Sequence, residues 1–258
     1  MNRQKRLRVY TFTLAVLLAC APLASAQSQA AAPAPAPGSP SDVVRAFYTA
    51  LRERRFRDAF TMSVFRAAVE PLSNEEFEDL RPDFEPMAVN SPPEVVITGE
   101  QVSGDEATVF MKLGEGNKIE VVPVYLIREG AAWIVGDREG RESVKKAGKR
   151  FFFDARIDTH HTEVEKMLSR ISAAQFVYAS QHGGAFGDLE ALVKAGLVPE
   201  DVKGTRTTGY RFTVAPAKNG ASWTARAEPE RYGRTGKLSF YMDPSGIRKK
   251  DAGGKPIN

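Results

Sequence analysis

The sequence contains one cysteine, Cys20, close to its start. The rest of the chain therefore has no thiol for a disulfide, a thiolate metal site or a cysteine nucleophile. Beyond residue 40 it also lacks a charge excess. The first 40 residues hold four of the 36 Lys and Arg and none of the 32 Asp and Glu, so the remainder carries 32 of each sign. A neutral chain has no general electrostatic affinity for nucleic acid, and we expect no nucleic-acid partner.

The sequence also lacks the common catalytic motifs. It contains no G-x-S-x-G elbow, no phosphate-binding Walker loop, no H-E-x-x-H zinc motif and no Gly-rich dinucleotide turn. We therefore expect a non-enzymatic protein with no catalytic residue, no metal and no cofactor. Its composition, 42% hydrophobic and 26% charged, is typical of a globular chain rather than a disordered one.

The first 26 residues have the pattern of an export signal. Basic residues within 3–8 precede an apolar run at 9–19, and a small-x-small sequence ends at Ala26. The run is too short to span a bilayer, so we expect no transmembrane helix in the mature chain. The alternative is lipidation of Cys20, which would supply a lipid anchor. We favour simple secretion because the leucine before Ala19 fits the lipidation motif poorly. Both routes lead out of the cytoplasm, to the periplasm or beyond.

A spacer and a first domain follow the signal. Residues 27–40 are uncharged and rich in Ala and Pro, which favours an extended linker. Ser41 then has the character of a helix N-cap, and the apolar residues after it recur at helical spacing. Two further helices are expected over 56–64 and from Ser73.

After residue 93 the apolar spacing becomes typical of strands. Turn residues separate four runs, which predicts an antiparallel meander over 94–102, 107–113, 118–128 and 132–136. Pro123 lies inside the third run. Because proline cannot donate to the sheet, we expect it at an edge or a bulge. These elements predict an α+β domain over 41–138.

The second half has the same two kinds of element. We expect a charged connector at 139–157, a long helix from Asp158 and a short helix at 189–195. Short strands are expected at 210–215, 222–227, 238–242 and 247–248. The predicted second domain, 158–258, is a long helix packed on a small antiparallel sheet.

The first half resembles the nuclear transport factor 2-like family. The matching runs are VVRAFYTAL at 43–51, RDAF at 57–60, VYLI at 124–127 and WIV at 133–135. The resemblance implies a cone-like domain in which a curved antiparallel sheet wraps around helices and leaves a pocket. Enzymatic members place an Asp or His with a Tyr inside the cone, whereas this half has no His. By apolar spacing, the pocket-lining residues would be Tyr48, Phe60, Phe77 and Tyr125.

The second half resembles the globular head of type IV pilin-like and pseudopilin-like proteins. The matching runs are ISAAQFVYA at 171–179, FGDL at 186–189, GYRF at 209–212 and FYMDPSGIR at 240–248. A pilin begins with a prepilin peptidase site and a long apolar helix. Here an export signal and a separate domain occupy that position, which implies a pilin-type head without its polymerisation stem.

Three weaker patterns suggest sites. His160 and Glu163 share a helical face at the spacing of metal ligands, but a third ligand is lacking and we favour a solvated helix start. Asp243 and Asp251 flank a loop like those that bind Ca²⁺, but we favour a simple turn. Residues 41–150 carry a balance of −4 and residues 151–258 a balance of +4. This favours either contact between the halves or, as we prefer, two solvated surfaces.

These observations predict an exported, non-enzymatic cell-envelope protein that binds or scaffolds envelope protein partners. The resemblance of the second half links it to pilus or secretion assemblies. The alternative is a small-molecule-binding protein or weak enzyme that uses the pocket of the cone-like domain.

Overall fold

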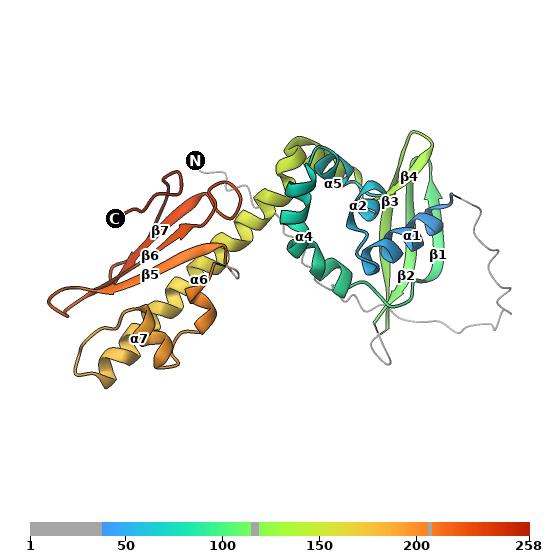
Figure 1. Ribbon diagram of the computed structural model, residues 1–258. Coiled ribbons are helices and arrows are strands. Elements are labelled where there is room, and N and C mark those ends of the chain that lie inside the picture. The colour runs from blue at the N-terminus through green and yellow to red at the C-terminus, as the bar shows by residue number, and fades with distance from the viewer. Residues whose placement is uncertain (1–37, 115–118, 206–207) are drawn as a thin grey trace, which may run out of the picture. The chain divides into compact units, whose positions relative to one another are not determined.

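The computed structural model describes residues 38–114, 119–205 and 208–258 (Figure 1). The predicted export signal, Cys20 and the predicted linker up to residue 37 lie outside the described residues. The fold class is α+β, as the sequence predicted, with helices and two four-stranded antiparallel sheets.

Helix α1 spans Pro40–Arg52 and begins earlier than the sequence suggested. Its N-cap is Ser39, whose side chain accepts a hydrogen bond from the backbone N–H of Asp42, while the Asp42 carboxylate accepts from the backbone N–H of Ser39. The expected N-cap, Ser41, instead lies buried inside the helix and donates to Glu100. The start moves because proline at the first helical position and a reciprocal capping box together favour Ser39.

Three helices follow in the first half. They are α2 (Phe56–Thr61), α3 (Arg66–Val69) and α4 (Asn74–Val89). Helix α4 begins where the sequence predicted, with Ser73 and Glu76 forming its capping box. These helices bury a core rich in phenylalanine: Phe47, Phe56, Phe60, Phe77, Phe84 and Phe153.

The first sheet is the predicted meander, β1 (Val96–Ser103), β2 (Glu106–Leu113), β3 (Glu120–Glu129) and β4 (Ala132–Val135), in that order. Figure 1 shows α1 lying across one face of it. Within the sheet, strand β4 pairs with Leu126–Glu129 of β3, and its last residue, Val135, also forms a bridge with Ser63. Pro123 therefore pairs with β2 but lies beyond the end of β4, at the edge position expected for a residue without an N–H.

The predicted connector is largely helical. Helix α5 spans Arg138–Ala147, a 3-10 turn covers Gly148–Arg150, and α6 runs over Phe151–Gln181 rather than starting at Asp158. Phe153 at its first turn is buried in the helical core of the first half, and Phe152 packs against that core. Burial of these rings extends the helix toward the N-terminus, which the charged composition of the segment concealed.

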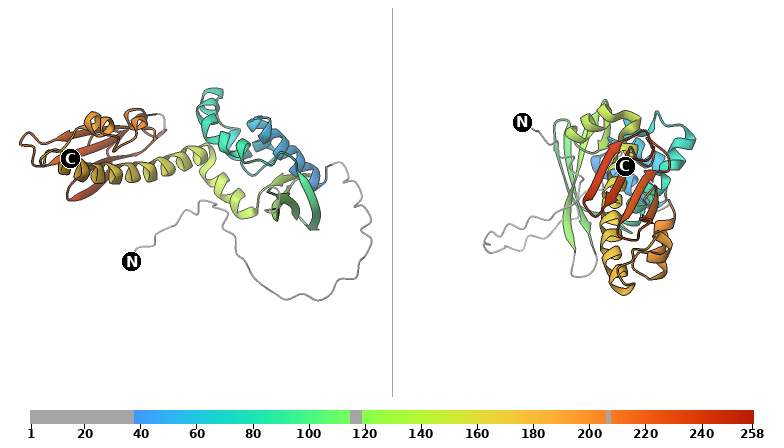
Figure 2. Two further views of the ribbon diagram at one scale, coloured as in Figure 1. Left: turned by 90° about the horizontal axis from the view of Figure 1, so that it is seen from below. Right: turned by 90° about the vertical axis from the view of Figure 1, so that its left-hand side faces the viewer.

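The second half packs a sheet on α6. Helix α7 (Leu189–Lys194) and a 3-10 turn (Glu200–Lys203) precede β5 (Tyr210–Pro216), β6 (Trp223–Pro229), β7 (Leu238–Asp243) and β8 (Gly246–Asp251). The strands pair in sequence order, and α6 lies along one face (Figures 1 and 2). The core between them contains Val164, Leu168, Ile171, Tyr210, Phe212, Trp223 and Phe240.

In the part of the chain that the structure describes, no helix has both the length and the apolar character needed to cross a membrane.

Candidate functional site

The structure does not gather the four expected pocket residues around one cavity. Phe60 and Phe77 are buried in the helical core, and Tyr48 is half-buried where that core meets the sheet. Tyr125 is 53% exposed, because its neighbours Val124 and Leu126 on β3 face the core and successive side chains alternate. Apolar spacing selected Tyr125, whereas the alternation along the strand places it on the outward face.

Aromatic rings fill the space around Phe60. Its ring centroid lies 4.7 Å from that of Phe84 and 5.2 Å from that of Phe152, and Phe56 and Phe65 also stack or abut against it. Such rings pack as a dense apolar core. The interior of the helical layer therefore holds side chains where the family resemblance implied a pocket.

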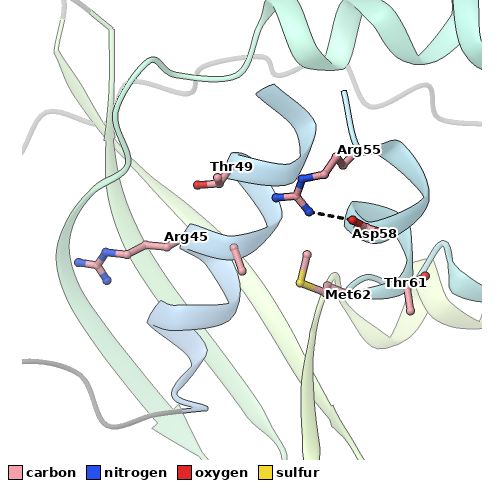
Figure 3. A pocket seen from close by; sticks show the side chains of 7 residues that line it. Arg45, Thr49, Arg55, Asp58, Thr61 and Met62 are labelled. Carbon is pink, nitrogen blue, oxygen red and sulfur yellow. Dashed lines mark hydrogen bonds and ion pairs between the residues drawn. The ribbon is translucent and has the colours of Figure 1, made fainter. Parts of the chain in front are cut away.

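A groove lies instead between α1 and α2 and has a volume of about 530 Å³ (Figure 3). Helix α1 contributes Arg45, Ala46 and Thr49, which share one side because Thr49 follows Ala46 by three residues and Arg45 by four. The remaining lining residues are Arg55, Asp58, Thr61 and Met62. The sequence did not predict this groove, because a surface depression depends on how two helices pack and leaves no motif.

At one end of the groove the charged side chains are paired with each other. Arg55 donates through Nη1 to Asp58 at 2.8 Å and through Nη2 to Glu53 at 2.7 Å, as the dashed line to Asp58 in Figure 3 marks. These hydrogen bonds raise the pKa of Arg55 above its usual value. Thr61 donates its hydroxyl to the carbonyl of Arg57. The polar groups at this end are therefore already engaged with each other or with the backbone.

Arg45 differs from these groups. Its guanidinium makes no hydrogen bond or ion pair with any described residue, although Nη1 is buried. Figure 3 shows the guanidinium extending away from Arg55 and Asp58, on the side of α1 that faces the strands. A buried donor without an acceptor is costly, so this atom favours binding of an acceptor from outside the chain.

The histidines do not form a metal site. Among the described residues no three His, Cys, Asp or Glu side chains lie close enough together to hold a metal ion. His160 contacts the carbonyl of Thr235 through Nδ1 at 2.8 Å, and Nε2 of His161 accepts from the backbone N–H groups of Lys237 and Leu238. Both histidines lie within α6, so the expected solvated helix start is wrong. Their rings hydrogen-bond α6 to the residues around the start of β7.

The loop after Asp243 is a turn, and the carboxylates of Asp243 and Asp251 both accept hydrogen bonds from other groups of the chain. Pro244 and Ser245 connect β7 to β8, and Asp243 accepts from the backbone N–H of Ser245 at 2.8 Å and from Arg248 at 2.7 Å. Asp251 accepts instead from the hydroxyl of Tyr232 at 2.9 Å. The two carboxylates thus serve separate partners.

Comparison with protein-family models, with curated proteins and with solved structures finds no match to this chain. The function has to be inferred from the residues of the chain itself.

Proposed function

We propose that the protein is an exported, non-enzymatic binding protein of the cell envelope whose groove between α1 and α2 binds a carboxylate of its ligand. The observation that carries this proposal is Arg45, a residue of the groove with a buried guanidinium nitrogen and no partner among the described residues.

A carboxylate is the acceptor that best suits this guanidinium. Arginine presents planar, fork-like donors that match the two oxygens of a carboxylate, and such charge-assisted bonds are about twice as strong as neutral ones. Thr49, one helical turn after Arg45, adds a hydroxyl donor on the same side of α1. Ala46 and Met62 offer apolar contact to the carbon chain of the ligand.

The groove supports binding rather than catalysis. A general base or nucleophile needs a free, positioned group. Asp58, the carboxylate of the groove, is held by Arg55 in an ion pair at 2.8 Å. With this carboxylate occupied, the groove presents hydrogen-bond donors and apolar surface to a ligand.

The location and the partner class rest on the sequence. The signal pattern over 1–26 supports export, and the resemblance of the second half to pilin heads supports a role in envelope assemblies, with another envelope protein as partner. Intact-mass measurement of the protein from its native envelope tests export. A chain starting at Gln27 or lipidated at Cys20 supports the proposal, and an unprocessed N-terminus contradicts it.

Calorimetry on the mature protein tests the groove. We would titrate two probes, glutarate as a small dicarboxylate and a short peptide rich in Glu, into the wild-type chain and into the Arg45→Gln and Arg54→Gln variants. Arg54 is the matched control because it is an exposed arginine that already pairs with Glu85. We expect Arg45→Gln to weaken binding about tenfold or more and Arg54→Gln to leave it unchanged.

The two probes separate the two sources of a carboxylate. Binding of glutarate supports a small-molecule ligand, whereas binding of the peptide alone supports an acidic protein partner. If neither probe binds the wild-type chain, or if Arg45→Gln binds both as tightly as the wild type, the proposal is wrong.

A further inference from the structure

The face of the second sheet that points away from α6 carries the final residues of the chain. Trp223, Ala225 and Ala227 on β6 are buried in the core with α6, so Arg226 between them faces the opposite side. There Arg226 donates through Nε to the carbonyl of Ile257 at 3.2 Å and through Nη2 to the side chain of Asn258 at 2.7 Å. Figure 1 shows this end of the chain turning back beside the strands.

Side-chain contacts across three neighbouring strands hold Arg226 in position. In the strand register it lies opposite Tyr241 of β7, which in turn lies opposite Arg248 of β8. Both guanidinium groups lie over the Tyr241 ring, at 5.5 Å for Arg226 and 4.4 Å for Arg248. Cation–π contacts of this kind hold the two arginines in place before any partner arrives.

Two polar atoms on the same three strands have no partner among the described residues. They are Oε1 of Glu228 and the hydroxyl of Ser239, and both atoms are buried. Glu228 lies two residues after Arg226, and Ser239 two residues before Tyr241, so each shares the outward face of its strand. Segment 252–258 therefore engages Arg226 but leaves these two polar atoms of the same face without a hydrogen bond, which marks it as an imperfect occupant.

The face is also basic. Arg211 of β5 lies opposite Glu228, and Lys250 of β8 lies opposite Ser239. With Arg226 and Arg248, four cations share the face with two acids, Glu228 and Asp243. Asp243 already pairs with Arg248 at 2.7 Å, but the cations still outnumber the acids. The groups that Arg226 now binds, a backbone carbonyl and an asparagine amide, are neutral acceptors. A carboxylate in their place forms a charge-assisted bond and also gains from the surrounding cations.

We propose that the outward face of β6–β8 is a docking site for an extended, acidic segment of a partner protein, and that segment 252–258 occupies this site until the partner displaces it. The site is separate from the α1–α2 groove, and neither depends on the other. Arg226 is the anchor, and Arg248 beside Tyr241 extends the docking surface across the sheet.

Truncation after Asp251 tests the displacement. Fluorescence anisotropy would measure the affinity of labelled oligoglutamate, oligoglutamine and oligolysine peptides for the full chain and for the truncated chain. We expect truncation to raise the affinity for oligoglutamate about tenfold, since one occupant of Arg226 has been removed, and to leave the other two peptides weak. Within the truncated chain, Arg226→Gln should remove this gain, whereas Lys218→Gln, in the turn between β5 and β6, should not.

A second measurement on the full chain covers the case in which truncation prevents folding. The backbone N–H of Lys255 donates to the carbonyl of Ala252 within the segment. Its hydrogen exchange should speed up when oligoglutamate is added and stay constant with oligolysine. Unchanged exchange at saturating oligoglutamate overturns the proposal, as does a folded, truncated chain with unchanged affinity for oligoglutamate.

Discussion

The guanidinium of Arg156 on α6 lies against the carboxylate of Asp83 on α4, with Nε 2.9 Å from Oδ2. Its Nη1 lies 3.3 Å from Asp79 of the same helix, and the arginine side chain is only 6% exposed. One buried cation thus joins the start of α6 to two acidic positions one helical turn apart on α4.

Replacing Arg156 by Leu should destabilise the protein by about 3 kcal/mol, because it leaves the largely buried Asp79 and the partly buried Asp83 without their shared partner. Urea unfolding near neutral pH measures the change. Arg54→Leu is the control, since its pair with Glu85 is exposed and should contribute less than about 1 kcal/mol. Equal effects of the two substitutions would contradict a special role for the buried pair.

The same cluster should make stability depend on acid pH. Burial opposes ionisation of Asp79, but the hydrogen bond from Arg231 and the charges of Arg156 and Arg231 outweigh it and lower the pKa of Asp79. An acid whose pKa is lower in the folded state contributes stability above its unfolded pKa, about 3.9, and loses it as the pH falls through the folded pKa. The wild-type chain should therefore exceed Asp79→Asn in stability by about 2 kcal/mol near neutral pH, and the gap should close below about pH 4.

Urea unfolding at a series of pH values would follow that gap. Glu75→Gln supplies the comparison, because Glu75 lies exposed in the first turn of the same helix. Its difference from the wild type should stay small at every pH. A gap for Asp79→Asn that does not change with pH would show that Asp79 contributes through its shape rather than its charge.

Local signals in the sequence predicted the elements of the fold well. Turn glycines and β-branched runs indicated the first meander, and Ser73 with Glu76 indicated the start of α4. The start of α6 was missed because Phe152 and Phe153 pack against the core of the first half, and no local rule reports such a contact.

The candidate sites were less predictable, because they depend on pairing. Arg45, which has no partner in the part of the chain that the structure describes, has the same letter in the sequence as an arginine with a partner. The opposite charge balance of the two halves did indicate the contact that we considered less favoured: Arg231 and Arg234 of the second half pair with Asp79 and Glu76 of α4. The charge balance indicated that the two halves attract each other, whereas only the fold identified the residues that pair.

Gly236 should not tolerate a side chain. A Cβ at this position would overlap the hydroxyl of Tyr210, which is buried and donates to the carbonyl of Leu238 at 2.8 Å. Gly236→Ala should therefore cost about 3 kcal/mol through overpacking. Gly204→Ala is the control, since its Cβ would make only an ordinary contact at 3.6 Å and its φ is −101°. Thermal unfolding would compare the two variants, and we expect Gly236→Ala to melt at the lower temperature. Equal melting temperatures would contradict the predicted clash.

Glu228 should make stability depend on pH in the opposite sense to Asp79. Burial raises the pKa of this carboxyl, and the charges of Arg226 and Arg211 only partly offset the effect. When the folded pKa is raised, the unfolded chain ionises first, so stability falls as the pH rises from the unfolded pKa, about 4.3, through the folded pKa. Glu228→Gln cannot ionise, and it should gain stability over the wild type between about pH 4 and neutral pH.

The urea midpoints of Glu228→Gln and of the wild type, measured near pH 4 and at neutral pH, would show this gain in stability. Glu230→Gln, at the exposed next outward position, is the matched control and should show no such change. The proposed docking site adds a further expectation: truncation after Asp251 frees Arg226 from the segment, so that its charge can approach Glu228, and the gain should shrink in the truncated chain. If the gain persists there unchanged, segment 252–258 does not hold Arg226 away from this carboxyl.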